Sequence, residues 1–358
     1  MRKGGAGLRG AASASALLLP SSEDSGAGGE PSKECPILVA VRVRPRNEKE
    51  LASGDPPCVR VLSRSHLCIS KNEGVNQYLN SQRGRVNDYE FDVVFDETAT
   101  QAEVYQRSTQ PRVASVLDGY SLTVFAYGAT GSGKTHSMFV LTLPLLLYCG
   151  TAQVYNDRLY DLLSPGDGAP LRIREDARRG VTEVAGLTRR RVSSAAEALE
   201  CISEGNHNRR VGSTAHNSVS SRSHAILQVH VRSDGVQECS AVMSLVDLAG
   251  SERAGAAAKD RQRLTEASHI NQSLLALGNC INALSGEGDA QCQAKYRDSK
   301  LTHLLKGSLE GHCSVVMIVA VAPCSGTYED SHNALKYANR AKEIRVKSPS
   351  KRRVDVEM

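Results

Sequence analysis

The sequence predicts a layered α/β domain, and three observations support this. Runs of β-type residues alternate along the chain with segments of helical periodicity. The 358 residues, of which 40% are hydrophobic, are enough to bury one large core or two smaller ones. One apolar strand runs directly into a glycine-rich turn that a helix should follow.

The first half of the chain should fold from residue 37 onward. Residues 1–34 are rich in glycine, alanine and serine, so we expect a flexible extension there. A run of β-type residues at 37–43 ends at Pro45 and predicts the first strand. The elements expected next are strands within 58–69 and 89–95, a polar loop at 71–88 between them, a helix over 100–117 and a strand over 122–127.

In the second half, a helix should start after Thr135. Apolar residues from 270 to 284 recur every three or four positions, which predicts one face of a helix. We expect strands at 226–231, 241–246 and 315–321, and a last helix at 328–345. The folded domain should therefore span 35–345, followed by a short basic tail at 346–358.

Composition excludes several classes of protein. The net charge of +5 is too small to predict a nucleic-acid partner, and we expect none. No apolar stretch approaches the ~20 residues that cross a bilayer, so we expect no membrane partner. The ten cysteines contain no Cys-x-x-Cys pair and are typical of reduced thiols in a cytosolic protein. The basic residues near the amino terminus leave a transit peptide open, although a disordered extension is favoured.

The glycine-rich turn matches the phosphate-binding loop pattern, with strand before and helix after. Its glycines let the backbone approach phosphate groups closely. Lys134 should reach the β- and γ-phosphates, and the Thr135 hydroxyl should bind Mg²⁺. The loop reads Gly128, Ala129, Thr130, Gly131, Ser132, Gly133, Lys134 and Thr135.

A second element supplies an acid near the metal. The apolar strand at 241–246 should deliver Asp247 to the carboxyl edge of the sheet, where it can hold a water of the Mg²⁺ shell. Gly250 would let a backbone N–H approach the γ-phosphate. Alone, this motif could equally be a strand that ends in an ordinary turn acid.

The third element is the hydroxyl-rich stretch at 217–224. Loops of this kind can become ordered around Mg²⁺ and phosphate, and Arg222 could pair with a carboxylate when the loop closes. Alone, the stretch would be read as a polar turn.

Together these elements, with a few further stretches, resemble the motor domains of kinesins. The resemblance covers nearly all of residues 37–345, and within it 127–131, 271–284 and 337–342 are most similar to the kinesin-8 group. Beyond the phosphate loop it rests on Phe125-Ala126-Tyr127-Gly128, Ser220-Ser221-Arg222-Ser223-His224, Asp247-Leu248-Ala249-Gly250-Ser251-Glu252-Arg253, Tyr296-Arg297-Asp298-Ser299-Lys300-Leu301-Thr302 and Leu335-Lys336-Tyr337-Ala338.

The resemblance implies a P-loop NTPase of the kinesin motor fold: a central mixed, mostly parallel sheet with helices on both faces. It implies that Arg222 and Glu252 form an ion pair that closes over ATP and aligns the attacking water. Mg²⁺ would be held by Thr135, Ser221 and, through water, Asp247. The residues implied in catalysis are Lys134, Ser221, Arg222, Gly250 and Glu252, and those implied in ATP binding besides the phosphate loop are Arg42, Arg44, Pro45, Tyr120, His136, Asn217 and Ser220.

The family's partner is the microtubule, and the resemblance implies a tubulin-facing surface over 270–305. Lys295, Arg297 and Lys300 are the contacts we expect there. His303 stands where many kinesins carry a basic residue. The arginines at 189–191 are either a solvated loop or a second contact.

One region departs from the family pattern. Between Met138 and Val154 the chain is shorter than in kinesins, and Pro144 should end the helix after the phosphate loop within about two turns. Either this is a shortened kinesin, or the sequence derives from an imperfect gene or splice model.

We expect a microtubule-stimulated ATPase and motor of the cytoplasm and cytoskeleton, with regulation of microtubule ends left open. The alternative is a protein that binds microtubules and nucleotide with little turnover. Residues 344–347 match the start of the family's neck linker, and no heptad repeat follows them, so we expect a monomer.

Overall fold

The computed structural model describes residues 34–71, 86–138, 148–164, 169–176, 181–211, 221–233, 239–252, 261–285, 294–311 and 313–347. The predicted extension, apart from Glu34, and the tail beyond Lys347 lie outside these residues. Among the residues described, no helix combines the length and apolar character that a membrane crossing needs.

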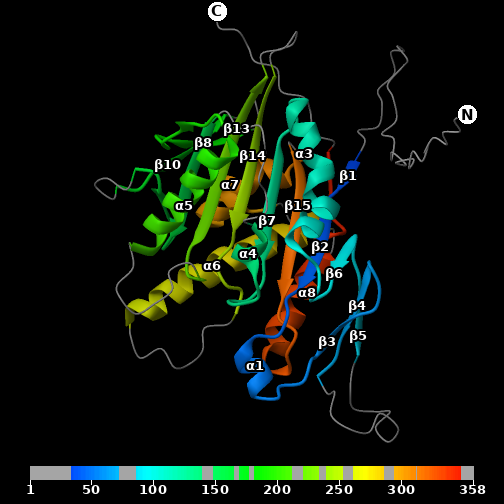
Figure 1. The fold of residues 1–358 in the computed structure, drawn as a ribbon. Helices are drawn as coiled ribbons and strands as arrows, with labels where there is room; N and C mark the ends of the chain where they lie inside the picture. The colour runs from blue at the N-terminus through cyan, green and yellow to red at the C-terminus, as the bar shows by residue number, and fades with distance from the viewer. Residues whose placement is uncertain are drawn as a thin grey trace, which may run out of the picture. The chain divides into compact units, whose positions relative to one another are not determined.

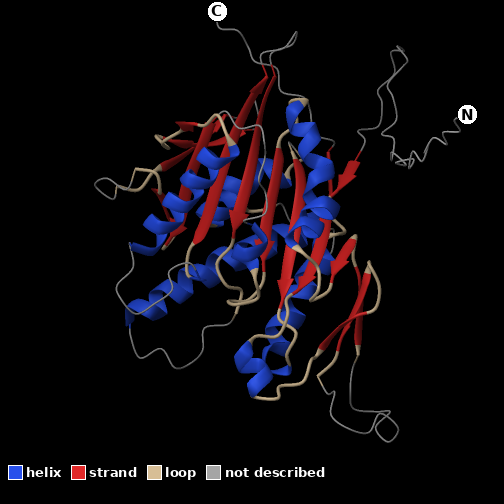
Figure 2. Ribbon diagram, in the orientation of Figure 1, coloured by secondary structure: helices blue, strands red, loops and turns tan. Residues whose placement is uncertain are grey.

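A mixed β-sheet forms the centre of the domain (Figures 1 and 2). Its neighbouring strands β14, β7, β15, β2 and β6 are parallel, and β13, β8, β9 and β12 extend it with antiparallel pairs. Helices cover both faces, which explains why all eight residues of β15 are buried. In sheet order the strands are β12 (Arg190–Arg191), β8 (Tyr148–Tyr155), β13 (His224–Ser233), β14 (Cys239–Asp247), β7 (Leu122–Tyr127), β15 (Ser314–Val321), β2 (Leu38–Val43) and β6 (Val93–Phe95), with β9 (Arg158–Asp161) paired to β8.

Two groups of helices cover the sheet. The face shown toward the viewer in Figure 1 carries α2 (Gln101–Val104), α3 (Gln110–Leu117), α4 (Lys134–Met138) and α5 (Ala195–Val211). A π-helical segment, Tyr105–Thr109, joins α2 to α3, so the helix predicted at 100–117 is present but not uniform. The opposite face carries α6 (Arg261–Leu284), α7 (Lys300–Leu309) and α8 (Tyr328–Ala341).

Smaller elements lie around the edges of the sheet. A three-stranded sheet contains β3 (Val59–Val61), β4 (His66–Ile69) and β5 (Asn87–Glu90). A hairpin contains β10 (Arg172–Asp176) and β11 (Val181–Ala185), and β1 (Glu34–Pro36) pairs with β16 (Arg345–Lys347). The short helical elements are α1 (Glu48–Ala52) and the 3₁₀ turns η3 (Tyr296–Asp298) and η4 (Ser325–Thr327).

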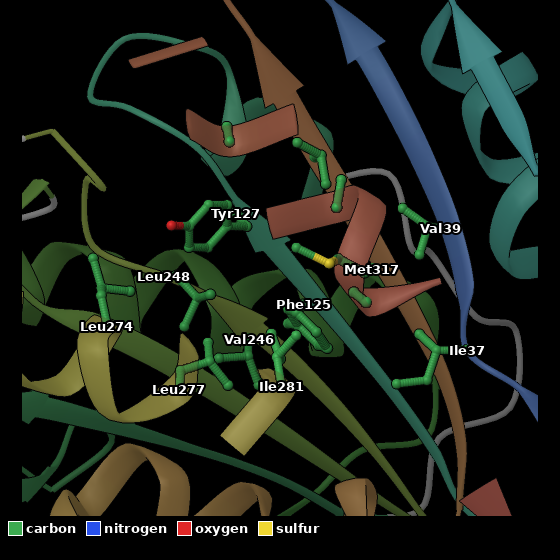
Figure 3. Close-up of a cluster of buried hydrophobic side chains, with 14 of the residues drawn as sticks. Ile37, Val39, Phe125, Tyr127, Val246, Leu248, Leu274, Leu277, Ile281 and Met317 are labelled. Carbon is green, nitrogen blue, oxygen red and sulfur yellow. The ribbon is translucent and has the colours of Figure 1, made fainter. Parts of the chain in front are cut away.

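The largest apolar cluster joins β14 to α6. Leu274, Leu277 and Ile281 on α6 lie in one cluster with Val246 and Leu248, as Figure 3 shows. Side chains alternate between the two faces along a strand. Asp247, between the two apolar residues, therefore points to the opposite face, toward α4 and α5.

Most predicted elements are confirmed, with two corrections. The last helix ends at Ala341 and not at residue 345, because Arg345 pairs in β16 with Pro36 of β1. The polar loop expected up to residue 88 ends earlier, since Asn87 already belongs to β5.

The short region after the phosphate loop still leads into a complete strand. The described part of α4 ends at Met138, and β8 begins at Tyr148. This strand pairs with β13 from Tyr148 to Val154, so the core strand at this position of the sheet is present. Pro144 lies outside the described residues.

Candidate nucleotide-binding site

The phosphate loop joins the carboxyl end of β7 to α4. Gly128, Gly131 and Gly133 have φ angles of 142°, 77° and 100°, which residues with a side chain rarely adopt. A Cβ on Gly128 would also lie 2.2 Å from the carbonyl oxygen of Ala320 on β15. The loop geometry therefore requires these glycines.

Lys134 is held against the inside of this loop. Its ammonium donates to the carbonyl oxygens of Gly128 at 2.9 Å and Ala129 at 2.8 Å. Burial lowers the pKa of Lys134 to about 8, and the negative charge of Asp247 opposes that shift. A buried cation beside a cluster of backbone N–H groups is suited to bind phosphate.

Thr135, Asp247 and Arg209 meet beside the loop. The Thr135 hydroxyl donates to Asp247 Oδ2 at 2.9 Å, and the Arg209 guanidinium donates to the same oxygen at 2.8 Å. Arg209 is almost fully buried and also donates to the hydroxyl and carbonyl of Ser223. Sequence reasoning missed Arg209, since nothing in its helix distinguishes it from a solvent-exposed arginine.

The donor set at this point fits a magnesium ion. Asp247 Oδ1 is buried and has no hydrogen-bond partner among the described residues. Mg²⁺ prefers carboxylate, hydroxyl and water oxygens, and it commonly keeps several waters. A water of its shell would give Asp247 Oδ1 the donor that it lacks.

The turn after Asp247, residues 247–252, is bonded to the phosphate loop; we call it the Asp247 turn. Ser251 N–H donates to Gly128 O at 3.1 Å, and Glu252 accepts from Thr130 N–H at 2.7 Å and from the Thr130 hydroxyl. Gly250 N–H donates to Ser221 O at 3.0 Å. A Cβ on Gly250 would lie 2.2 Å from oxygens of Glu252 and Thr130, so a larger residue would force these two side chains to shift.

The predicted ion pair between Arg222 and Glu252 is absent from this structure. Arg222 instead pairs with Glu266 of α6 at 3.1 Å, and Glu266 also accepts from the Tyr155 hydroxyl at 2.6 Å. The physical reason is competition: Thr130 already occupies both oxygens of Glu252, and α6 offers a second carboxylate. Glu266 belongs to no motif, so sequence reasoning had no signal from which to find it.

The arginines predicted to contact the base have different positions. Arg44 donates to Gly131 O at 2.8 Å and pairs with Glu50, so it lies against the phosphate loop. Arg42 is buried and donates to Ser137 Oγ at 3.2 Å and to Gln101, which makes it a support of α4. His136, on α4, is exposed.

Two further predicted ATP residues, Tyr120 and Pro45, are not brought into this cluster. Tyr120 precedes the first residue of β7, whereas the phosphate loop follows the last, so the strand separates them by roughly 20 Å. This position gives no support to its assignment to the base. Pro45 is exposed beyond β2 and has no contact with the loop that the structure records, and Asn217 and Ser220 lie outside the described residues.

The predicted partner contacts lie on η3 and α7. Lys295, Arg297 and Lys300 are exposed. Arg297 is not unpaired, because it lies 3.3 Å from Glu175 of β10. The three arginines at 189–191 include two ion pairs, Arg189 with Glu183 and Arg190 with Glu204.

Two basic side chains of α7 also contact Glu175. Lys306 donates to it at 3.1 Å, and His303 contacts its other oxygen. These hydrogen bonds, from Lys306 first and then His303, lower the pKa of Glu175 to about 2. Sequence reasoning did not find this cluster, because Glu175 is far from residue 303 in the chain.

Comparison with known proteins agrees with this geometry. A family model described as the kinesin motor domain matches residues 42–141 and 143–344. The chain is 43% identical to the mouse kinesin-like protein KIF18A over 86% of its length, and 47% identical to kinesin-like protein 5 of Schizosaccharomyces pombe over 74%. It is 42% identical to KIF19 of Xenopus laevis over 89% of its length. The similarity to KIF18A confirms the predicted likeness to the kinesin-8 group.

Solved structures show the same fold. A fast kinesin superposes with a TM-score of 0.76 at 31% identity, covering 90% of this chain and 96% of that one. A KIF14 dimer bound to a microtubule with AMP-PNP gives 0.78 at 28% identity, covering 91% and 98%. The chain spans 39% of KIF18A, 33% of kinesin-like protein 5 and 35% of KIF19. By its family match, its relatives and its fold, this chain belongs to the kinesin motor domain family.

Proposed function

We propose that this chain is a microtubule motor ATPase of the cytoplasm and cytoskeleton, in which the state of a bound ATP controls the grip on tubulin. The observation that carries the proposal is the double attachment of the Asp247 turn. On one side it is hydrogen-bonded to the phosphate loop, and on the other Leu248 packs on α6. A change at the γ-phosphate would therefore be transmitted to the helix that the family presents to tubulin.

The residues divide the chemical work. Lys134 and the loop N–H groups would bind the phosphates. Gly250 N–H would detect the terminal one after it leaves Ser221 O, to which it donates here. Thr135 and Asp247, with Ser221 nearby, would hold Mg²⁺, which supplies charge neutralisation on the phosphate oxygens. Glu252 and Arg222 would position the attacking water once they pair with each other.

Formation of that pair requires two exchanges. Glu252 must leave Thr130, and Arg222 must leave Glu266. The present arrangement therefore corresponds to a state before hydrolysis is possible. ATP binding would favour the exchange if the phosphate competes for the Thr130 N–H.

The partner surface would consist of α6, η3 and α7. Lys295, Arg297 and Lys300 are exposed there, and tubulin presents an acidic surface to motors of this family. Such contacts weaken as salt rises, since exposed charges are screened. Within the described part of the chain nothing resembles a dimerisation coil, and we propose that this polypeptide acts as a monomer.

A second candidate function is a kinesin-like protein that binds microtubules and nucleotide with little turnover. The observation that favours it is the short connection between α4 and β8, through residues 139–147. Helix α4 carries Thr135, so a poorly supported α4 would misplace the metal site without abolishing binding.

The test is ATP turnover by the purified chain, with and without microtubules. Stimulated phosphate release supports the motor, co-sedimentation without turnover supports the second candidate, and failure of both refutes the proposal. Glu252→Ala should lower the stimulated rate by on the order of 100-fold or more. Glu329→Ala, which removes an exposed glutamate paired with Lys71, is the matched control and should keep the parental rate.

A further inference from the structure

One buried imidazole has no part in the mechanism above. His224, the first residue of β13, is 2% exposed. Its Nδ1 accepts the N–H of Ala249 at 3.0 Å, and its Nε2 lies 2.8 Å from the hydroxyl of Ser273 on α6. The Ser273 hydroxyl also lies 2.8 Å from the carbonyl of Ile270, to which it donates.

These contacts specify one tautomer. Ala249 N–H is a donor, so Nδ1 must carry a lone pair. Ser273 gives its only proton to Ile270, so its oxygen must accept from Nε2–H. Both ends therefore require the neutral ring with its proton on Nε2. Burial, with the charges of Arg209 and Lys134, lowers the pKa of His224 to about 3, so the ring stays neutral at physiological pH.

The hydrogen bonds of His224 join the Asp247 turn to α6, and the proposed motor function requires these two elements to move together. Ala249 lies between Asp247 and Gly250, so any shift of the Asp247 turn displaces its N–H. Among the described residues, the turn also meets α6 through the apolar packing of Leu248, and apolar contact is not directional. Hydrogen bonds depend on both distance and angle, so they transmit a rotation that apolar packing would absorb.

We propose that His224 is a positioning residue that couples the Asp247 turn to α6 through its two hydrogen bonds. This inference rests on the proposed motor function for its biological meaning. Loss of either bond should leave nucleotide binding and basal turnover intact, while the acceleration by microtubules falls. The hydrogen bonds that the structure gives for His224 and Ser273 go to Ala249, to Ile270 and to each other, and not to the phosphate loop.

Two substitutions separate the two bonds. In His224→Asn, the side-chain oxygen lies near the level of Nδ1 and can still accept from Ala249, while the donor to Ser273 is lost. In His224→Gln, the amide nitrogen reaches the level of Nε2 and can donate to Ser273, while the acceptor for Ala249 is lost. Ser273→Ala breaks the same connection without changing the imidazole.

The matched control is Ser331→Ala on α8. Ser331 is likewise a buried helical serine, and its hydroxyl donates to a backbone carbonyl, that of Ala322, at 2.9 Å. Any effect of losing a buried serine hydroxyl on general stability should appear in both serine variants. Thermal unfolding identifies variants that do not fold, and Ser273→Ala decides the outcome if the His224 variants are among them.

Two readouts test the proposal. The first is the ratio of microtubule-stimulated to basal turnover, measured with the microtubule concentration for half-maximal rate. We expect a fall of threefold or more in the ratio for His224→Asn, His224→Gln and Ser273→Ala, with less than a twofold change in basal rate and half-maximal concentration. A smaller fall in folded Ser273→Ala, or an equal fall in Ser331→Ala, overturns the proposal.

The second readout does not need microtubules. Hydrogen–deuterium exchange of the α6 amides is compared between Mg·ADP and Mg·AMP-PNP. The parent should show a nucleotide-dependent difference that falls threefold or more in Ser273→Ala; an undiminished difference in Ser273→Ala, or none in the parent, overturns the proposal. If microtubules do not stimulate the parent, the proposed function fails, while this exchange experiment still decides the role of His224.

Discussion

The buried pair of Arg209 and Asp247 permits a sharp prediction about stability. Arg209→Met removes the guanidinium from a 2.8 Å ion pair whose side chains are only 1% and 10% exposed. It leaves the Asp247 carboxylate in the protein interior with Thr135 as its remaining described donor. Removing one partner of a buried ion pair typically costs about 3–5 kcal/mol, because the other charge stays desolvated.

A surface pair of the same kind supplies the comparison. Arg190 and Glu204 lie 2.6 Å apart, closer than the buried pair, but their side chains are 43% and 40% exposed. Exposed pairs contribute about 0.2–1 kcal/mol, since water and salt screen them. Arg190→Met should therefore cost much less than Arg209→Met, although it breaks the shorter contact.

The assay is urea denaturation of the nucleotide-free chain, followed by circular dichroism. We expect the Arg209→Met variant to lose about 3–5 kcal/mol of unfolding free energy, which corresponds to roughly 4–7 °C in melting temperature for a domain of this size. The loss of unfolding free energy in Arg209→Lys should lie between the losses in Arg209→Met and Arg190→Met. Lysine keeps the positive charge but not the paired donors to Ser223. Equal losses in Arg209→Met and Arg190→Met would refute the argument from burial.

Three further predictions follow from the same site and its partner surface. Burial lowers the pKa of Lys134 to about 8 from its ordinary 10.5, so between these values the unfolded chain holds a proton that the folded chain has released. In urea titrations, the unfolding free energy of the parent should therefore rise by about 2 kcal/mol from pH 8 to pH 9.5, relative to the change in Lys134→Met. A fall of the unfolding free energy over this range would contradict the prediction. Gly250→Ala should lower steady-state ATPase on the order of 100-fold while the chain stays folded, because the added Cβ would lie 2.2 Å from oxygens of neighbouring side chains; near-parental turnover would contradict this. Glu175→Gln should increase microtubule co-sedimentation severalfold and make it more sensitive to salt, because Arg297 and Lys306 lose their internal partner; unchanged or weaker binding would show that Glu175 does not restrain them.

The parts of the fold that the sequence predicted are those whose signals are local. Strand β7 and the phosphate loop are specified within a few residues by an apolar run, glycines that need positive φ angles, and the start of α4. The strand β15 was predicted because a continuous apolar run marks a strand buried on both faces. For these elements, the nearby residues alone were sufficient to predict the structure.

Pairings between distant segments could not be predicted in this way. Arg345 leaves the helical pattern because it pairs with Pro36, more than three hundred residues earlier, and helical periodicity carries no information about that partner. The Arg209 side chain reaches Ser223 and Asp247 only because α5 packs beside β13 and β14. Tyr120 is a different case, since the length of β7 alone places it at the end of the strand away from the phosphate loop.

Arg222 marks the limit of motif reasoning at the site itself. Its two candidate carboxylates, Glu252 and Glu266, differ in what else they bind: Thr130 holds the first through the phosphate loop, and Tyr155 shares the second with Arg222. On the proposed mechanism, the choice would depend on whether a phosphate takes the Thr130 N–H, and a motif cannot encode a choice that depends on a ligand. Because Glu266 lies on α6, the same exchange that completes the catalytic pair would release this helix from the loop of Arg222. Hydrolysis competence and a free α6 would then be two consequences of one exchange, which is the coupling that a motor requires.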